Sequence, residues 1–257
     1  MFLSASFADA GLLQKTIAVL YDLVTECSAT ITPEGIFIQA MDASHVCLIV
    51  VRWPAHGFKS FHATGTALVG VHLGNLLKIL KCSNKSDSVT ISIDDPASDQ
   101  LSVSFHDDVR TATFGIRLMD RDDEQLGVPD MDHVAVVTMP SGDFQAACRD
   151  LSTLSDTTSM TVDSDGLTLT SRGDVGTATL VYAGVEAVKT TQLTQSFALR
   201  YLNSFAKGSV IAPHVALKMS PEMPLVLAFA NGVSNLTFYL APKIEDELMP
   251  DETNEDA

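Results

Sequence analysis

Two hydrophobic periods alternate along the chain. In residues 10–22, 73–81, 141–153 and 199–206 apolar residues recur every three or four positions, the spacing that gives a helix one apolar face. Other runs alternate apolar and polar residues or are rich in β-branched ones, which is typical of strands. These runs are residues 28–31, 35–39, 46–52, 89–93, 101–105, 111–118, 134–139, 160–162, 167–171, 177–182, 195–198, 215–219, 225–229 and 235–240. The pattern predicts an α+β fold, with two helices covering an antiparallel sheet in each half.

The second half of the chain repeats the first. Gly11, Leu13, Gln14, Ile17, Leu20, Leu23 and Gly35 recur in the same order as Gly142, Phe144, Gln145, Cys148, Leu151, Leu154 and Gly166. Residues 75–78 align with 203–206, with Lys207 one place later, and residues 101–105 align with 225–229. A period this long predicts two similar domains rather than a solenoid of short repeats.

Composition limits the classes of protein to consider. The chain has 257 residues, of which 46% are hydrophobic, enough for two ordinary cores. We expect a soluble intracellular protein, because no apolar segment is long enough to span a bilayer and residues 1–10 lack the pattern of a secretory signal. The cysteines form no CxxC pair and lie in or beside apolar runs, which favours buried reduced thiols over a metal site or a disulfide framework. They are Cys27, Cys47, Cys82 and Cys148.

Charge is distributed unevenly in a chain whose formal net charge is −16. Acidic residues gather in residues 94–108, 120–132 and 245–256, as in solvated loops and a terminus. The predicted helices instead carry mostly basic residues outside their apolar stripes, against only Asp22, Asp143 and Asp150. These basic residues are Lys15, Lys78, Lys81, Arg149, Arg200 and Lys207. Ordinary solvated helix faces would explain them; a surface that meets a polyanion is the other interpretation.

Several motifs together resemble the sliding clamps of eukaryotic DNA replication, from Met1 to about Asp246. The resemblance implies a DNA clamp fold, with an N-terminal clamp domain at 1–117, an interdomain connecting loop at 118–134, a C-terminal clamp domain at 135–246 and an acidic, disordered tail at 247–257. The motifs are Met41-Asp-Ala-Ser-His-Val46, Leu77-Lys-Ile-Leu-Lys-Cys82, Leu118-Met-Asp120, Glu124-Gln-Leu-Gly127, Met139-Pro-Ser-Gly142, Cys148-Arg-Asp-Leu151, Phe197-Ala-Leu-Arg-Tyr-Leu-Asn203 and Tyr239-Leu-Ala-Pro-Lys-Ile-Glu-Asp246.

The resemblance implies a homotrimer that closes around duplex DNA, with two helices of each domain on the inner face. The six basic residues would contact phosphates without reading bases. Gln14, Tyr21, Ala146 and Thr153 stand at inner positions that are often basic in relatives, so we expect weaker DNA affinity. The ring would close where edge 109–117 meets edge 175–182 of the next copy, although Phe114 also suits an ordinary core position. The implied interface residues are Arg110, Phe114, Leu151, Leu154, Val175, Thr177, Thr179 and Tyr182.

The resemblance also implies a docking surface for short partner peptides beside the connecting loop. The implied partners are DNA polymerase, the clamp loader, flap endonuclease and DNA ligase, in the nucleus, with no membrane. The matching positions are Met41, His45, Val46, Leu126, Val128, Pro129, Pro224, Tyr239, Ala241, Pro242 and Ile244. A structural role for His45 is the alternative to partner contact. Ser164 replaces a lysine that accepts ubiquitin in many relatives, so we expect no such modification there.

Other functions have weaker support in the residues. HExxH, P-loop, GxGxxG and GxSxG motifs are missing from the sequence, so we expect no catalytic residues and no cofactor. The pairs Asp94-Asp95 and Asp107-Asp108 are typical of solvated loops rather than metal sites. The nearer alternative is a subunit of the heterotrimeric checkpoint clamp. The docking residues and the two complementary edges favour the homotrimer.

Overall fold

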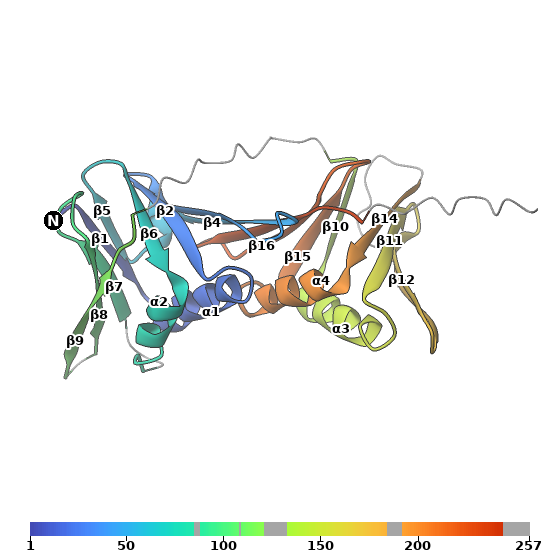
Figure 1. Ribbon diagram of the computed structural model, residues 1–257, viewed down its shortest axis with the longest axis horizontal. Helices are drawn as coiled ribbons and strands as arrows, with labels where there is room; N and C mark the ends of the chain where they lie inside the picture. The colour runs from blue at the N-terminus through green and yellow to red at the C-terminus, as the bar shows by residue number, and fades with distance from the viewer. Residues whose placement is uncertain (85–87, 108, 121–132, 184–191, 244–257) are drawn as a thin grey trace, which may run out of the picture.

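The computed structural model describes residues 1–84, 88–107, 109–120, 133–183 and 192–243. The molecule is elongated, with one sheet along a long side, the helices along the opposite side and a further sheet at each end (Figure 1). The helices lie within two residues of their predicted limits, and they are α1 (Ala10–Tyr21), α2 (Leu73–Leu80), α3 (Ser141–Leu151) and α4 (Leu199–Ala206). Short 3-10 helices are η1 (Ala55–Gly57) and η2 (Lys207–Val210). None of the helices in the described residues is long and apolar enough to cross a membrane.

Strands of the described residues form three antiparallel sheets. A five-stranded sheet at the N-terminal end has the order β5 (Ser60–Ala63), β1 (Leu3–Phe7), β7 (Ser88–Ile93), β8 (Gln100–His106) and β9 (Thr111–Arg117). An eight-stranded central sheet has the order β10 (Ala135–Pro140), β15 (His214–Met219), β16 (Leu225–Ala230), β17 (Asn235–Leu240), β4 (Cys47–Pro54), β3 (Gly35–Met41), β2 (Glu26–Thr32) and β6 (Ala67–His72). A four-stranded sheet has the order β13 (Gly176–Ala183), β12 (Gly166–Gly173), β11 (Thr157–Asp163) and β14 (Gln192–Ala198).

The central sheet joins the two halves, which corrects the expectation of one sheet per half. β17 from the second half pairs with β4 from the first, in a register that runs from Asn235 opposite Arg52 to Leu240 opposite Cys47. Backbone hydrogen bonds and a shared core therefore hold the halves together, and we call this β17–β4 pairing the inner seam. The fold remains two similar domains, but they share their middle sheet.

Sheet register defines how the two halves correspond. Glu26 lies opposite His72 in the first half, and Thr157 lies opposite Ala198 in the second. α2 begins directly after His72 and α4 directly after Ala198, so Leu73 corresponds to Leu199. The sequence alignment of residues 75–78 with 203–206 was therefore wrong by two positions, because it matched two asparagines that the sheet does not align. The corrected match makes Lys81 equivalent to Lys207.

One turn is built alike in both halves. Gly35 begins β3 with φ +146° and Gly166 begins β12 with φ +139°, backbone angles that residues other than glycine rarely adopt. A Cβ at Gly35 would also lie 2.2 Å from the Trp53 carbonyl oxygen. The repeat of this glycine therefore has a backbone cause.

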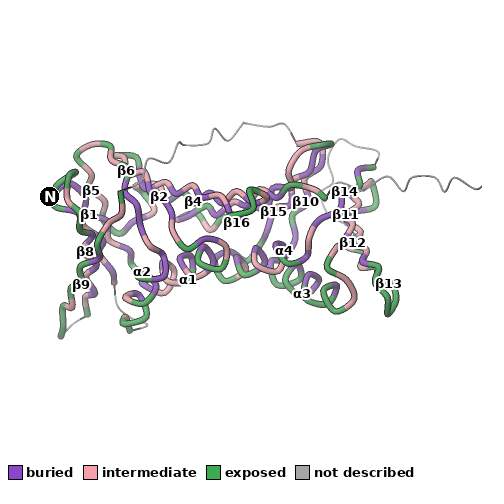
Figure 2. Tube along the Cα trace, in the orientation of Figure 1, coloured by how far each residue is buried: buried purple, intermediate pink, exposed green. Residues whose placement is uncertain are grey.

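The core lies between the helices and the sheets, where Figure 2 shows buried segments facing one another. The predicted helix stripes are buried, as at Leu13, Ile17 and Leu20. In the second half Phe205 stacks on Phe238 with ring centroids 4.3 Å apart. All four cysteines are unpaired thiols, but the expected burial is wrong for Cys82, which is exposed just after α2.

Candidate functional surfaces

The four helices form one continuous face of the molecule, opposite the sheets (Figure 1). Their apolar stripes turn toward the sheets, so their polar residues turn to solvent. All six predicted DNA-contacting residues are exposed on or directly after these helices. They are Lys15 on α1, Lys78 on α2, Lys81 after α2, Arg149 on α3, Arg200 on α4 and Lys207 at the start of η2.

Three of these six cations interact with a neighbouring side chain that partly offsets or covers their positive charge. Lys207 Nζ lies 2.6 Å from Asp22 Oδ2, and Arg149 Nε lies 3.2 Å from Asp150 Oδ1. The Arg200 guanidinium lies over the Tyr201 ring, 4.8 Å from its centroid. Exposed ion pairs are weak, so a phosphate can displace them, but they lower the net positive charge of the helix face.

The other half of the predicted cations is free to meet an anion. Within the described part of the chain, Lys15, Lys78 and Lys81 have no ion-pair partner. Of the inner positions that lack a basic residue, Tyr21 is 41% exposed, and Thr153 donates its hydroxyl to the Asp150 carbonyl oxygen over 2.7 Å. The helix face therefore carries a modest positive surface on a strongly acidic protein.

The loop between β3 and β4 is built around one buried carboxylate, Asp42. Asp42 Oδ1 accepts hydrogen bonds from the backbone of Val46 over 2.8 Å and of Cys47 over 2.7 Å. Its Oδ2 accepts from the Ser44 hydroxyl and, over 2.7 Å, from the Tyr201 hydroxyl. Burial raises the pKa of Asp42, but these hydrogen bonds outweigh it and lower the pKa to about 2. The carboxylate is therefore charged at neutral pH and fixes residues 42–46, which we call the docking loop.

Tyr201 connects the docking loop to the helix face across the two halves. It belongs to α4, and its hydroxyl donates a hydrogen bond to Asp42 Oδ2 and lies 2.6 Å from Ser44 Oγ. Arg200 covers its ring from the solvent side. A chain of contacts therefore runs from an exposed cation on the helix face to the loop that carries His45. No local sequence pattern signals this connection, which sequence reasoning missed.

The predicted docking residues within the described part of the chain gather at one corner of the central sheet. His45 is exposed in the docking loop at φ +57°, and Val46 is half-buried. The Ala241 backbone N–H donates to the Val46 carbonyl oxygen over 3.0 Å, which brings the end of β17 to the docking loop. Met41, Pro224, Tyr239 and Pro242 are half-buried, and Ala241 is exposed. Leu126, Val128, Pro129 and Ile244 lie outside the described residues.

Sheet register adds two residues to this corner that sequence reasoning missed. Leu48 lies opposite both Met41 and Tyr239, and Tyr239 lies opposite Val226 on its other side. Side chains at facing positions share one side of a sheet, so these four form an apolar row. Partial burial raises the pKa of Tyr239, and the nearby Arg52 opposes this shift. The alternation in residues 46–52 is the signal that identifies the side of Leu48.

Exposed sheet edges lie at opposite ends of the molecule. β9 ends the five-stranded sheet in Figure 1, and β13 ends the four-stranded sheet at the far end in Figure 2. The tips beside them expose apolar residues, with Val109 at 96% and Val175 at 84%. Among the predicted interface residues Arg110, Val175, Thr177 and Thr179 are exposed, while Phe114, Leu154 and Tyr182 are half-buried.

Two of the interface predictions need comment. Leu151 is fully buried in the core of its own chain, so the expectation that it contacts another copy directly is corrected: it has no surface to offer. Phe114 packs edge-on against Phe105 at 5.8 Å and is still half-exposed. It therefore supports its own domain and also presents part of its ring at the edge.

Two further sequence expectations concern Ser164 and metal binding. Ser164 is exposed in the turn between β11 and β12, where it offers a hydroxyl and no amino group. In the described residues no group of three or more His, Cys, Asp or Glu side chains is placed to hold a metal ion.

Comparison with known proteins agrees with this arrangement. Residues 1–126 match the family model of the proliferating cell nuclear antigen N-terminal domain, and residues 127–244 match that of its C-terminal domain. The boundary between the models falls inside the predicted connecting segment. The chain is similar to proliferating cell nuclear antigen of Caenorhabditis elegans, with 34% identity over 258 residues that cover 95% of this chain and 97% of the relative. The chain therefore belongs to the proliferating cell nuclear antigen family, the non-enzymatic sliding clamps of DNA replication and repair.

Proposed function

We propose that three copies of this chain close head to tail around duplex DNA, and that the ring binds replication proteins at the docking loop. The observation that carries this proposal is the pair of exposed edges, β9 and β13, at opposite ends of one protomer. A head-to-tail contact between different surfaces gives a closed ring when its rotation closes. Unpaired edges also favour strand addition.

The inner seam supplies a template for the contact between copies. β9 and β17 are equivalent, because Phe114 lies opposite Val103 and Phe238 lies opposite Leu227 in matching registers. β13 and β4 are equivalent in the same way, because Tyr182 lies opposite Leu167 and Trp53 lies opposite Ile36. Within the chain β17 pairs with β4, so β9 of one copy would pair with β13 of the next.

The template also gives a register for the interface. In the inner seam Phe238 lies opposite Ile49 and Thr237 lies opposite Val50. Transferred to the edges, Phe114 would lie opposite Ala178 of the next copy, and Thr113 opposite Thr179. The small Ala178 side chain leaves room for the half-exposed Phe114 ring. In this proposed register the predicted residues Thr177, Thr179 and Tyr182 would lie along one interface.

Disulfide crosslinking tests the ring and its register together. In a Cys82→Ser background, which removes the exposed native thiol, Thr113→Cys combined with Thr179→Cys should give covalent trimers under mild oxidation. The matched control combines Thr113→Cys with Val175→Cys, which the register displaces by four residues, or about 13 Å. Crosslinking in the control but not in the test pair would overturn the register. A monomeric mass by light scattering would overturn the homotrimer and favour the hetero-clamp alternative.

Contact between the ring and DNA would be electrostatic and independent of base sequence. The helix face carries six exposed cations of an acidic chain, and phosphates are their natural partners. Ion pairs at Lys207 and Arg149 weaken this attraction, so retention would depend on the closed ring. The expected result is retention on circular DNA with rapid loss from a linear fragment. Equal loss from both would contradict the encircling arrangement.

The apolar row beside the docking loop suits a short peptide with apolar or aromatic anchors. Met41, Leu48 and Tyr239 are half-buried side by side and leave part of their surface available to such anchors. The proposed users are DNA polymerase, the clamp loader, flap endonuclease and DNA ligase, in the nucleus. Peptides from these proteins should bind the ring and lose affinity in Leu48→Asp, while the matched control Leu68→Asp, at an exposed position of the edge strand β6, should bind unchanged. A fluorescent fusion of the chain tests the nuclear location.

A further inference from the structure

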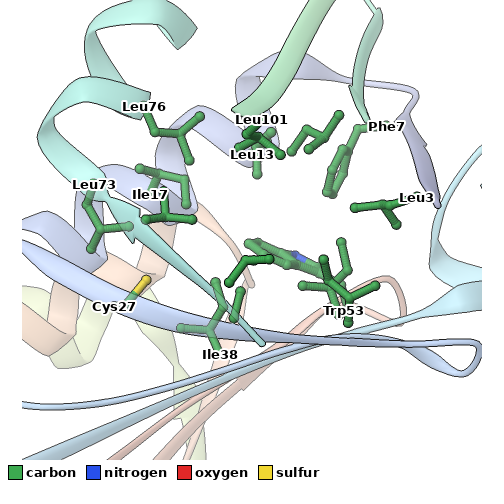
Figure 3. A pocket seen from close by; sticks show the side chains of 16 residues that line it. Leu3, Phe7, Leu13, Ile17, Cys27, Ile38, Trp53, Leu73, Leu76 and Leu101 are labelled. Atoms are coloured by element: carbon green, nitrogen blue, oxygen red, sulfur yellow. The ribbon is translucent and has the colours of Figure 1, made fainter. Parts of the chain in front are cut away.

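An apolar cavity of about 50 Å³ lies in the core of the N-terminal half. In Figure 3 Leu13, Ile17 and Leu76 from the helices lie on one side of it, and Trp53 and Ile38 from the central sheet lie on the other. No lining residue is more than 9% exposed. The cavity is therefore separate from the docking loop, the helix face and the edges.

The cavity has a cause in the repeat. Ile31 lies opposite Ile36 in the first half, and Val162 lies opposite Leu167 in the second, so Ala29 is equivalent to Met160. Ala29 lines the cavity, whereas Met160 is fully buried and fills the same position in the other core. The neighbouring position on the first helix of each half follows the same trend, with Leu13 at the cavity and Phe144 in the filled core. Smaller side chains on both layers leave the space.

The lining excludes water and charged ligands. Its side chains carry no hydroxyl, amide or charged group, and their hydrogen-bond donors are the Trp53 indole N–H and the weak Cys27 thiol, whereas a buried water requires two to four polar partners, about three on average. Apolar cavities of about 150 Å³ stay dry and accept benzene or xenon. A smaller cavity of the same character selects smaller guests. The atoms that face the empty space lack dispersion contacts that a guest would supply.

We propose that this cavity is a binding site for one small apolar molecule without hydrogen-bonding groups, of about the size of a xenon atom. We place the site in the N-terminal half, where Ala29 leaves space that the larger, fully buried Met160 side chain occupies at the equivalent position of the second half. Entry requires a local opening of the core, since every lining residue is buried. The bound molecule would contact none of the docking-loop residues, helix-face cations or edge residues described above.

The single tryptophan of the chain provides a direct probe, because Trp53 lines the cavity. Xenon quenches indole fluorescence through its heavy nucleus, and argon at equal pressure serves as the inert reference. In the full-length protein we expect saturable quenching of Trp53 by xenon. Ala29→Met, which introduces the side chain of the second half, should lose it. The matched control Ala216→Met adds the same side chain on the half-buried outer side of β15 and should keep it.

Methyl resonances give a second test that needs no variant. Under xenon the methyl groups of Ile17, Ile38 and Leu76 should shift, while those of Leu167 and Leu169 in the second core should not. Equal shifts in both cores, or quenching that rises linearly with xenon pressure and is the same in Ala29→Met, would overturn the proposal. These measurements detect the guest itself, so they do not depend on ring closure.

Discussion

The inner seam and the outer edges carry equivalent strands in different environments. Phe238 on β17 and Phe114 on β9 hold matching positions, yet Phe238 is fully buried and Phe114 is half-exposed. Phe238 stacks on Phe205 and contacts Phe229 edge-on at 6.2 Å, whereas Phe114 has Phe105 alone as an aromatic neighbour in the described residues. The same pairing geometry thus stabilises a fold at the seam and leaves a surface for association at the edges.

The largest effect should follow from Phe238→Ala. Removing a fully buried ring leaves a void between β17 and α4, and such changes lower the free energy of unfolding by about 3–5 kcal/mol. Urea unfolding followed by circular dichroism measures the loss. A change below about 1 kcal/mol would mean that the seam is not a main source of stability.

Phe114→Ala should separate assembly from folding. The variant should dissociate to monomers on dilution while each monomer stays folded, because its ring is only half-buried in its own domain. We expect about 1–2 kcal/mol lower unfolding free energy than wild type, measured at a dilution where both are monomeric. Light scattering across dilution reports the mass. A Phe114→Ala trimer as persistent as wild type would remove this residue from the interface.

Acid should lower the stability of the protein by protonating Asp42, whose carboxylate accepts a hydrogen bond from Tyr201 of the other half. Its pKa is lowered from 3.8 to about 2 in the folded protein, so its contribution is complete above about pH 4 and is lost as pH falls toward 2. The size of the pKa shift limits this contribution to about 2 kcal/mol. Wild type and Asp42→Asn should therefore differ in urea unfolding at pH 6 and converge near pH 2. A constant difference across this range would contradict a charged Asp42 as the cause.

Tyr201→Phe tests the same hydrogen bond without changing a charge. It removes the hydroxyl that donates to Asp42 and leaves the ring under Arg200, so it should cost about 1 kcal/mol of stability. Faster hydrogen exchange confined to the docking loop is the expected local sign. Unchanged exchange there would show that Asp42 holds the loop without α4.

The smallest expected effect concerns the helix face. Asp22→Asn frees Lys207 from its ion pair, and exposed pairs contribute about 0.2–1 kcal/mol, so DNA affinity should rise by no more than about fivefold. The steeper dependence on salt is a clearer sign than affinity itself. Asp165→Asn, in the exposed turn between β11 and β12, is the control for the change in net charge. A similar gain in both variants would mean that overall charge, not Lys207, is responsible.

The sequence was most informative where structure has a local cause. The apolar stripes of α1 to α4 predicted the helices, and the repeat of Gly35 as Gly166 marked equal turns. β1, β5 and β6 were missed, because Leu3-Ser-Ala-Ser-Phe7 and Ser60-Phe-His-Ala63 contain no β-branched residue and Gly70 interrupts the third. Short strands depend on their neighbours for their stability, and local propensity does not show those neighbours.

Long-range contacts explain the rest of what the sequence did not reveal. The inner seam joins residues nearly two hundred positions apart, and the sequence carries no pattern for the pairing of β17 with β4. The contact of Tyr201 with Asp42 spans 159 positions of the chain. Leu151 illustrates the opposite error, because a residue type that suits an interface also suits a core. The docking residues came from family resemblance rather than from any local rule.

The inner seam also has a mechanical consequence. Its strands lie in the middle of an eight-stranded sheet with core packed beneath them, whereas the edge strands β9 and β13 each have a sheet neighbour on one side only. Under tension a ring built from these protomers would part at a boundary between copies long before a protomer tore along its middle. Such a ring would open at one boundary between copies while each protomer stays folded, so the same boundary could close again.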